Sequence, residues 1–179
     1  MWQVLIPVAL ILGAVIIFNG LVKLRETVNG AWADIDVQLK RRHDLIPNIV
    51  STVKGYAAHE KETLEAVIQA RSSALSAQSP AEQAAAENML TGTLKSLFAL
   101  AESYPDLQAA EGFRDLQGTL SDIEGHIQQA RRYYNAVVRD FNTKIGQVPS
   151  NIIARAGGFK EQEFFEAGEA EREVPKVEF

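Results

Sequence analysis

The run from Met1 to Val22 contains no ionisable side chain, whereas almost every stretch after Lys23 is mixed and charged. A helix needs about 20 consecutive apolar residues to cross the hydrocarbon of a bilayer, and this run is long enough. Pro7 lies near its start, where a lost backbone hydrogen bond matters least, and glycines such as Gly13 are tolerated in transmembrane helices. The run therefore predicts a transmembrane helix over residues 1–22.

A cleaved signal peptide is the competing interpretation of this run. Such a peptide has a basic start, a shorter apolar core and a small-x-small cleavage site. No Lys or Arg precedes the apolar residues, and the exit from Phe18 to Lys23 has no Ala-x-Ala pattern. The sequence therefore favours an anchor that remains part of the protein.

Basic residues follow the apolar run and none precedes it. Lys23 and Arg25 flank its C-terminal end, partly offset by Glu26, and Lys40 to Arg42 lie at the edge of the range that the positive-inside rule counts. This pattern predicts an N-terminus outside the membrane and a cytoplasmic body. An extracytoplasmic body is the alternative.

The composition of the chain argues against nucleic-acid binding and excludes sites that depend on cysteine. The 179 residues suffice for one domain with a core, and a net charge of −5 argues against nucleic acid as a partner, because phosphate binding needs a basic face. The chain has no cysteine, which removes disulfides, zinc ribbons and thiol catalysis.

Apolar residues recur at spacings of three and four after Lys23, and no long period-2 alternation is present. The sequence predicts an all-α protein whose transmembrane helix continues into a long, coiled-coil-like antiparallel bundle over residues 23–148. We expect helices at about 23–75, 80–103 and 106–146, with a kink rather than a stop at Pro47. Ser79 and Pro80 form a helix start, and Asp106 is a candidate cap for the third helix. The third helix's stripe is interpreted as bundle core rather than as a seam for a partner.

Residues 149–179 are predicted to form a short helix over residues 151–156, ended by Gly157 and Gly158, and then an acidic tail. We expect the tail to be mobile unless it docks. Its aromatic residues are expected to be exposed and are candidates for docking a partner: Phe159, Phe164, Phe165 and Phe179.

No motif for catalysis, a cofactor or a metal is present. His43, His59 and His126 lack the His-Glu-x-x-His and paired Glu-x-x-His spacings that zinc and di-iron sites require. We therefore predict no catalytic, cofactor-binding or metal-binding residues and interpret the chain as not an enzyme. A hydrolase that uses these histidines with carboxylates is the third hypothesis.

Charged residues interrupt the apolar stripes at two places. Arg42, His43 and Asp44 fall in the first stripe, and Arg131, Arg132 and Asn135 flank Tyr133 and Tyr134 in the third. If these helices face each other, a buried polar layer must have its members paired, because an unpaired buried charge is costly. We interpret the layer as fixing helix register, with a docking site for a protein partner as the alternative.

A long, irregular string of residues closely resembles the bacterial LemA family. It consists of Trp32, Ile35, the run from Gln38 to Val50 that contains Arg42, Asp44, Pro47 and Asn48, and then Val53, Gly55, Tyr56 and His59. Further similarity covers Tyr104-Pro105, Arg132 to Asn135, Asn142, Pro149 and Phe164-Phe165-Glu166. The resemblance extends over nearly the whole chain.

This resemblance implies a bacterial inner-membrane protein with one span and an antiparallel helical bundle. It implies association with membrane protein quality control or envelope functions, and no catalytic residues. The matched positions are candidates for a shared structural or docking surface: Arg41, Arg42, Asp44, Pro47, Asn48, Gly55, Tyr56, Tyr134 and Asn135.

Two non-enzymatic functions fit these observations. The first is a membrane-anchored scaffold, integral in lipid, that forms a homo-oligomer through its helices, because the first helix is predicted to be longer than its partners. The second is an adaptor that docks a membrane protease or another membrane protein through its C-terminal tail.

Overall fold

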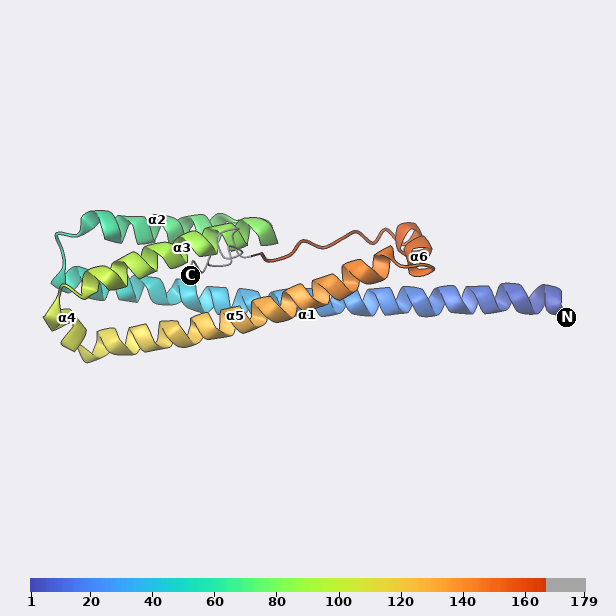
Figure 1. The fold of residues 1–179 in the computed structure, drawn as a ribbon, viewed down its shortest axis with the longest axis horizontal. Helices are drawn as coiled ribbons and strands as arrows, with labels where there is room; N and C mark the ends of the chain where they lie inside the picture. Colours follow the sequence, from blue (N-terminus) through green and yellow to red (C-terminus); the bar gives the residue numbers. More distant parts are fainter. Residues whose placement is uncertain (167–179) are drawn as a thin grey trace, which may run out of the picture. The chain divides into compact units, whose positions relative to one another are not determined.

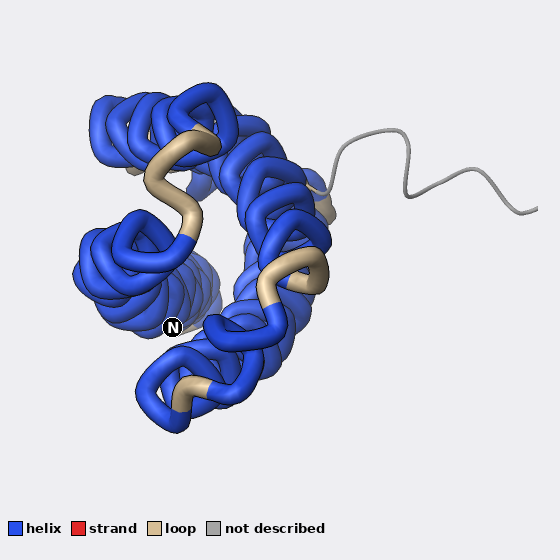
Figure 2. Tube along the Cα trace, turned by 90° about the vertical axis from the view of Figure 1, so that its left-hand side faces the viewer, coloured by secondary structure: helices blue, strands red, loops and turns tan. Residues whose placement is uncertain are grey.

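The computed structural model describes residues 1–166, with the backbone alone for Gln3. Its helices are α1 Trp2–Tyr56, α2 Lys61–Ser76, α3 Pro80–Ala101, α4 Pro105–Ala109, α5 Glu111–Gly146 and α6 Ser150–Ala156. Helices, short connections and the irregular segment after α6 make up this part of the chain, which contains no strand (Figures 1 and 2). The prediction of an all-α protein that begins with one long apolar helix is confirmed for these residues.

The chain divides into two compact units. Unit 1 comprises residues 1–35 and 130–164, and unit 2 comprises residues 36–129 together with Phe165 and Glu166. Helices α1 and α5 contribute residues to both units. Unit 1 thus joins the predicted membrane segment to residues near the other end of the chain. The predicted division into residues 1–22, 23–148 and 149–179 places these residues in separate parts.

Unit 2 is built around an apolar core. Leucine, isoleucine, valine and alanine side chains from one face of each helix fill it, among them Ile46, Ile49, Val53, Leu64, Val67, Leu90, Leu94, Leu97, Leu107 and Leu120. Burial of each larger side chain stabilises the unit by roughly 1.5–3 kcal/mol. Helices α2 and α3 pack side by side as an antiparallel hairpin (Figure 1).

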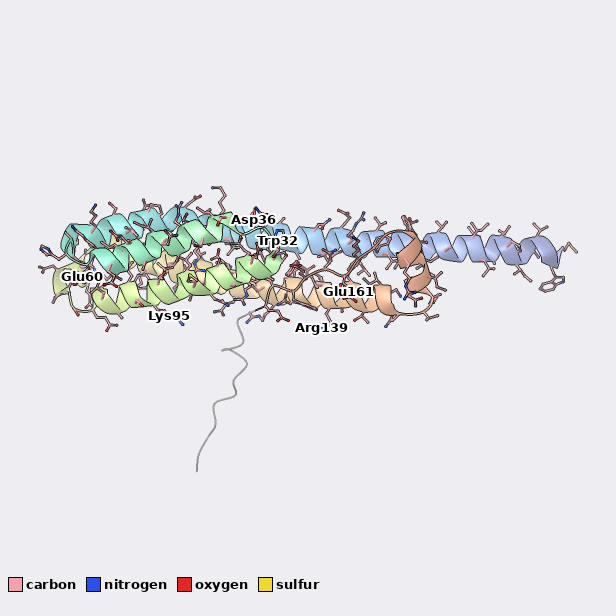
Figure 3. The ribbon with its side chains drawn as sticks, turned by 90° about the horizontal axis from the view of Figure 1, so that it is seen from above. Trp32, Asp36, Glu60, Lys95, Arg139 and Glu161 are labelled. Carbon is pink, nitrogen blue, oxygen red and sulfur yellow. The ribbon has the colours of Figure 1, made fainter. Side chains whose placement is uncertain are left out.

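The first helix of the body ends earlier than predicted. The sequence predicts one helix over 23–75, but α1 ends at Tyr56 and α2 begins at Lys61. A turn closes on Ala57, whose carbonyl accepts a hydrogen bond of 3.1 Å from the Glu60 amide. The Tyr104 hydroxyl donates to Glu60 Oε1 at 2.9 Å, so a distant residue contacts this turn. Figure 3 labels Glu60 near the end of unit 2 where α1 ends. Gly55 is a local helix-weakening residue beside this break, and no Pro lies between Tyr56 and Lys61.

The start of α3 follows the prediction, whereas the start of the third predicted helix does not. The Ser79 side chain accepts from the Glu82 amide, with Pro80 in the first turn. The residues predicted as one helix over 106–146 form α4 and α5, separated by the extended Ala110. Asp106 lies in the first turn of α4 and is not its cap.

The N-terminal part of α1 exposes its apolar side chains. It is the one helix within residues 1–166 that is long and apolar enough to cross a membrane, with a mean hydropathy of 2.6 in its most apolar window. Only 6% of that window is buried, whereas the core helix of a soluble protein would be mostly buried. Exposed apolar side chains over this length are what a membrane anchor requires.

Unit 1 buries the next turns of α1 against the C-terminal part of α5. Leu21, Val28 and Ala31 on α1 are buried, as are Val138 and Phe141 on α5. The rings of Trp32 and Tyr134 are in contact, with centroids 5.4 Å apart. These contacts begin where the exposed apolar segment ends.

Candidate functional site

A buried ion-pair network joins three helices of unit 2. Arg42 on α1 is only 1% exposed. Its Nη1 donates to Glu87 Oε2 on α3 at 2.8 Å, and its Nη2 lies 2.7 Å from Glu124 Oε1 on α5. Nη2 also donates to the Thr91 hydroxyl at 2.7 Å. One guanidinium therefore binds two carboxylates from two other helices.

The second oxygen of Glu87 is paired as well. Oε1 accepts from Gln83 Nε2 at 2.8 Å and lies 2.7 Å from His43 Nε2, so this imidazole nitrogen carries a proton and donates. Arg71 of α2 donates from Nε to the His43 carbonyl oxygen at 2.8 Å, which brings α2 into the network. We call Arg42, His43, Glu87 and Glu124 the charged layer.

A buried charged layer of this kind constrains which helix surfaces can pair and adds little net stability. A buried ion pair gains little over well-packed apolar residues, but removal of one partner leaves a buried charge uncompensated. Arg42 suits this position because its planar fork can bind two carboxylates at once, which a lysine cannot. A slip of α3 or α5 along α1 would separate these charges.

The charged residues of the third stripe are not the partners of Arg42. Arg131, Arg132 and Asn135, which would face Arg42 only if the two stripes met there, belong to unit 1. The observed partners are acidic. Glu87 lies three residues before Leu90 and seven before Leu94, so an acidic residue on the apolar stripe of α3 was the missed signal. Glu124 likewise lies three residues before Ile127 on α5.

An open groove lies beside the charged layer, between α1 and α5. It has a volume of about 470 Å³ and is lined by Arg41, Asp44, Leu45, Asn48, Thr119, Asp122, Ile123 and His126. Lys40 Nζ lies 2.9 Å from Asp44 Oδ2, and this hydrogen bond holds the pKa of the Asp44 carboxyl below its ordinary 3.8. We call this feature the α1–α5 groove. It brings together three predicted residues, Arg41, Asp44 and Asn48.

The α1–α5 groove combines charged, polar and apolar side chains. The Thr119 hydroxyl, which could serve as a nucleophile, donates to the Asp115 carbonyl oxygen of its own helix at 2.8 Å. Within residues 1–166, no group of three or more His, Asp or Glu side chains is placed to hold a metal ion. Mixed charges above the apolar Leu45 and Ile123 offer contacts to a polar partner.

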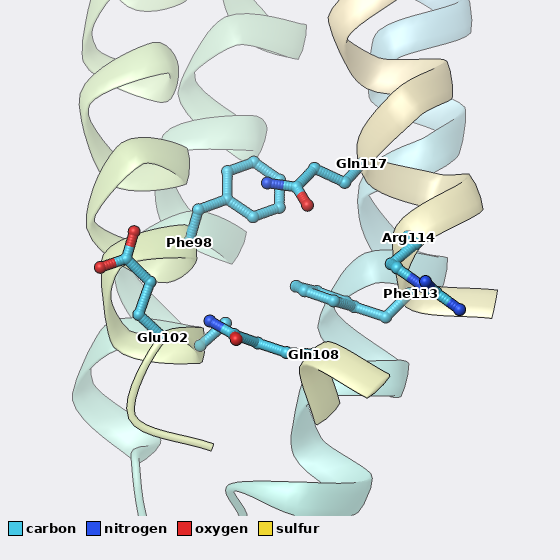
Figure 4. A pocket seen from close by; sticks show the side chains of 7 residues that line it. Phe98, Glu102, Gln108, Phe113, Arg114 and Gln117 are labelled. Atoms are coloured by element: carbon cyan, nitrogen blue, oxygen red, sulfur yellow. The ribbon is translucent and has the colours of Figure 1, made fainter. Parts of the chain in front are cut away.

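A second, smaller pocket lies at the end of unit 2, where α3, α4 and α5 meet. It has a volume of about 270 Å³, and its lining includes Phe98, Glu102, Gln108, Phe113 and Arg114 (Figure 4). The rings of Phe98 and Phe113 form its apolar wall, with centroids 6.1 Å apart. None of the residues predicted for a site lines this pocket.

The remaining predicted surface residues do not gather at one place. Pro47 and Gly55 are exposed on α1, and Tyr56, its last residue, is about half exposed. Tyr134 and Asn135 belong to unit 1, where Tyr134 is buried. The predicted surface is therefore divided among the charged layer, the α1–α5 groove, other exposed positions of α1 and unit 1.

Residues after α6 bind back onto unit 1. The side-chain amide of Asn142 pairs with the backbone of Gln162: Nδ2 donates to the carbonyl oxygen and Oδ1 accepts from the amide, both at 2.9 Å. The Tyr134 hydroxyl donates to the Glu163 carbonyl oxygen at 2.9 Å. Burial, and secondly the Glu163 charge, raise the pKa of Tyr134 above its ordinary value. We call these contacts the C-terminal clasp.

The tail aromatics up to Phe165 are partly or fully buried, contrary to the prediction that they are exposed. Phe165 is fully buried. The Phe159 ring lies edge-on to Phe18 at 5.6 Å and under the Arg25 guanidinium at 5.3 Å. Phe164 is partly buried, and Phe179 lies outside the described residues. Apolar rings bury themselves wherever the chain can reach a surface, which a list of exposed tail residues does not anticipate.

Comparison with known proteins places these features in a family. The model of the LemA family matches residues 31–179. The chain is 28% identical to Protein LemA of Metamycoplasma hominis over 158 residues, which covers 86% of this chain and 71% of that protein. Two magnetosome proteins are also similar. MamQ of Magnetospirillum gryphiswaldense is 26% identical to this chain, and the match covers 91% of this chain and 70% of that protein. MamQ 2 of Paramagnetospirillum magneticum is 25% identical, and the match covers 92% of this chain and 70% of that protein.

Proposed function

The chain belongs to the LemA family, and from this premise we propose that it is a non-enzymatic scaffold, anchored in the bacterial inner membrane, that self-associates through its helices. The exposed apolar segment of α1 supports the anchor, because only 6% of its most apolar window is buried. We also propose that the scaffold serves membrane protein quality control, the role that the family resemblance implies.

One observation carries the proposal of self-association. The outer face of α3 presents exposed, uncharged residues at heptad spacing: Ala85, Met89, Gly92, Ser96 and Ala99. Met89 is 60% exposed, and a Cβ added at Gly92 would meet no atom within 4 Å. Small residues at such spacing let a second helix approach closely. We call these residues the α3 stripe.

The length of α1 does not support self-association. The predicted mismatch between a long first helix and shorter partners pointed to lateral association. In the structure, the apolar side chains left exposed at the start of α1 are those of the membrane segment, which lipid would cover. Self-association therefore rests on the α3 stripe and not on the length of α1.

A cysteine cross-link tests the α3 stripe, because the chain has no native cysteine. We expect Ser96→Cys to give a covalent dimer on mild oxidation in lipid, since a stripe that pairs with its own copy brings the two thiols together. Ser121→Cys on α5 is the matched control, because it makes the same substitution at another exposed serine. Equal dimer yield from both variants, or none from either, would rule out pairing through this stripe.

The α1–α5 groove supports a second candidate, an adaptor for a membrane protein such as a protease. The adaptor hypothesis placed docking on the tail aromatics, but Phe159 and Phe165 are engaged within the chain. The groove instead offers Arg41, Asp44 and Asn48 on an exposed face of α1. Asn48→Trp should fill the groove and abolish co-purification of a partner while the Ser96→Cys cross-link persists, and retained co-purification would count against this candidate.

A further inference from the structure

The C-terminal part of unit 1 lies beside the end of the predicted membrane segment. The Phe159 ring contacts Phe18, which lies within the charge-free run of residues 1–22. A Cβ on Gly157 would meet Phe159 at 2.8 Å and the Phe18 ring at 3.0 Å, so the end of α6 also packs closely against this part of α1. Gly158 has a φ of +70°, which lets the chain turn back immediately after α6.

The pairing of α1 with α5 independently places α6 beside the same part of α1. Trp32 contacts Tyr134, and α5 runs antiparallel to α1 (Figure 1). Two antiparallel helices rise equally per residue, so the end of α5 at Gly146 lies near Gly20 on α1. The connection to α6 and α6 itself therefore lie where the membrane segment ends.

Two large apolar side chains at this level are exposed. Val148 in the connection is 78% exposed, and Ile152 on α6 is 64% exposed. The opposite side of α6 is buried through Ser150 and Ala154. Single exposed apolar residues are ordinary on a surface, but these two are close in the chain, beside an apolar span.

The residues around the end of the membrane segment carry a positive net charge, whereas the net charge of the whole chain is negative. Residues 1–25 and 141–160 contain Lys23, Arg25, Lys144, Arg155 and Lys160 and no Asp or Glu. Glu26 and Asp140 adjoin these ranges, and Glu26 Oε1 lies 3.7 Å from Arg25 Nε. The chain carries a net charge of −5, which leaves −10 for all other residues. We call these five residues the basic collar. Basic side chains around an apolar segment are attracted to anionic lipid headgroups.

We propose that α6 and the connection before it form a second membrane contact, in which Val148 and Ile152 enter the lipid interface and the basic collar binds anionic headgroups. Interfacial elements bury their apolar side chains roughly 5–10 Å into the headgroup and acyl boundary. This proposal rests on the membrane anchor of the proposed function. It adds that the C-terminal half of the chain binds the same lipid surface.

Depth-dependent quenching of single labels tests the apolar part. Val148→Cys, Ile152→Cys, Ile68→Cys and Val8→Cys are labelled with an environment-sensitive fluorophore, and the full chain is placed in phosphatidylcholine vesicles that contain phosphatidylglycerol. We expect a shallow spin-labelled lipid to quench the labels at 148 and 152 but not the one at 68, which replaces an exposed residue of unit 2. Labels at 148 and 152 that behave like the one at 68 would overturn the proposal.

The label at residue 8 separates the two claims. A deep spin-labelled lipid should quench it whether or not α6 touches lipid. If it is not quenched, the anchor fails and the second contact fails with it. If it is quenched while the labels at 148 and 152 are not, the second contact alone is wrong.

A charge variant tests the basic collar. We expect the triple variant Lys144→Gln, Arg155→Gln and Lys160→Gln to lose the increase in quenching at residue 152 that phosphatidylglycerol causes in the otherwise unchanged chain. The matched control is Lys54→Gln, Lys61→Gln and Lys95→Gln, which removes the same charge from exposed lysines of unit 2. Equal loss in both variants, or loss in neither, would contradict headgroup binding by the collar.

Discussion

Arg42 connects α1 to α3 and α5 through hydrogen-bonded ion pairs of 2.7–2.8 Å. Replacement by Met leaves the buried Glu87 without its counter-ion, and we expect this to destabilise the fold by about 3–5 kcal/mol. Arg42→Lys should also destabilise, because an ammonium cannot make two directed bonds in this geometry. Urea unfolding of the full chain in detergent, followed by helix content, measures both.

The exposed Lys40 and Asp44 pair provides the control for Arg42. It joins neighbouring turns of one helix, and both side chains face water. We expect Lys40→Met to leave the unfolding midpoint unchanged, because solvent screens such a pair. If Arg42→Met behaved like Lys40→Met, the charged layer would have no structural role.

Tyr134 makes stability depend on pH in the alkaline range. Burial and the Glu163 charge raise its pKa in the folded state above the ordinary 10.0. The unfolded chain therefore releases this proton first as pH rises, so the contribution of Tyr134 is complete below pH 10 and is lost as pH rises through the folded pKa.

Unfolding midpoints measured from pH 8 upward test this linkage. Tyr134→Phe should lower stability by about 1 kcal/mol near neutrality, because the bond to the Glu163 carbonyl is lost. The variant should then lose less stability than the unchanged chain as pH rises above 10. The Glu60 hydrogen bond also raises the pKa of Tyr104. Because Tyr104 is present in both the variant and the unchanged chain, its effect cancels when the two stabilities are compared. Parallel curves for the two proteins would refute the linkage.

At the scale of the element, helix ends that are determined by neighbouring residues could be predicted from the sequence. The start of α3 follows from the Ser79 cap and Pro80, and the end of α6 follows from Gly157 and Gly158. The break after Tyr56 has only Gly55 as a local signal, and a tyrosine 44 residues after Glu60 contacts the turn. Arg42 was found from its place on an apolar stripe, but its partners required knowledge of which helices are neighbours.

The C-terminal clasp is the element whose order was least expected. Asn142 binds the Gln162 backbone through both side-chain atoms, as a strand edge would. We expect Asn142→Leu to release residues 160–165 and to raise their amide hydrogen exchange, while α2 and α3 stay protected. Asn88→Leu on α3 is the control for the loss of a half-buried amide. Unchanged exchange at residues 160–165 would show that burial of the aromatic rings alone holds the segment.

At the scale of the whole molecule, the sequence predicted an anchor and a helical body but not the pairing of the two ends of the chain in unit 1. Phe18 and Phe159 are separated by most of the chain. Neither residue has a local pattern that identifies the other, since an apolar ring can pack against many surfaces. The family model begins at residue 31, so the match itself does not include the membrane segment.

Orientation decides which leaflet the basic collar meets, and the positive-inside rule predicts the cytoplasmic one. Because the chain has no cysteine, Trp2→Cys and Ser121→Cys can each be labelled alone. A membrane-impermeant maleimide applied to intact spheroplasts should label Trp2→Cys at once and Ser121→Cys only after permeabilisation. The reverse result would place the helical body outside the cytoplasm. The basic collar would then face the outer leaflet, and its five cations would oppose the rule that governs insertion.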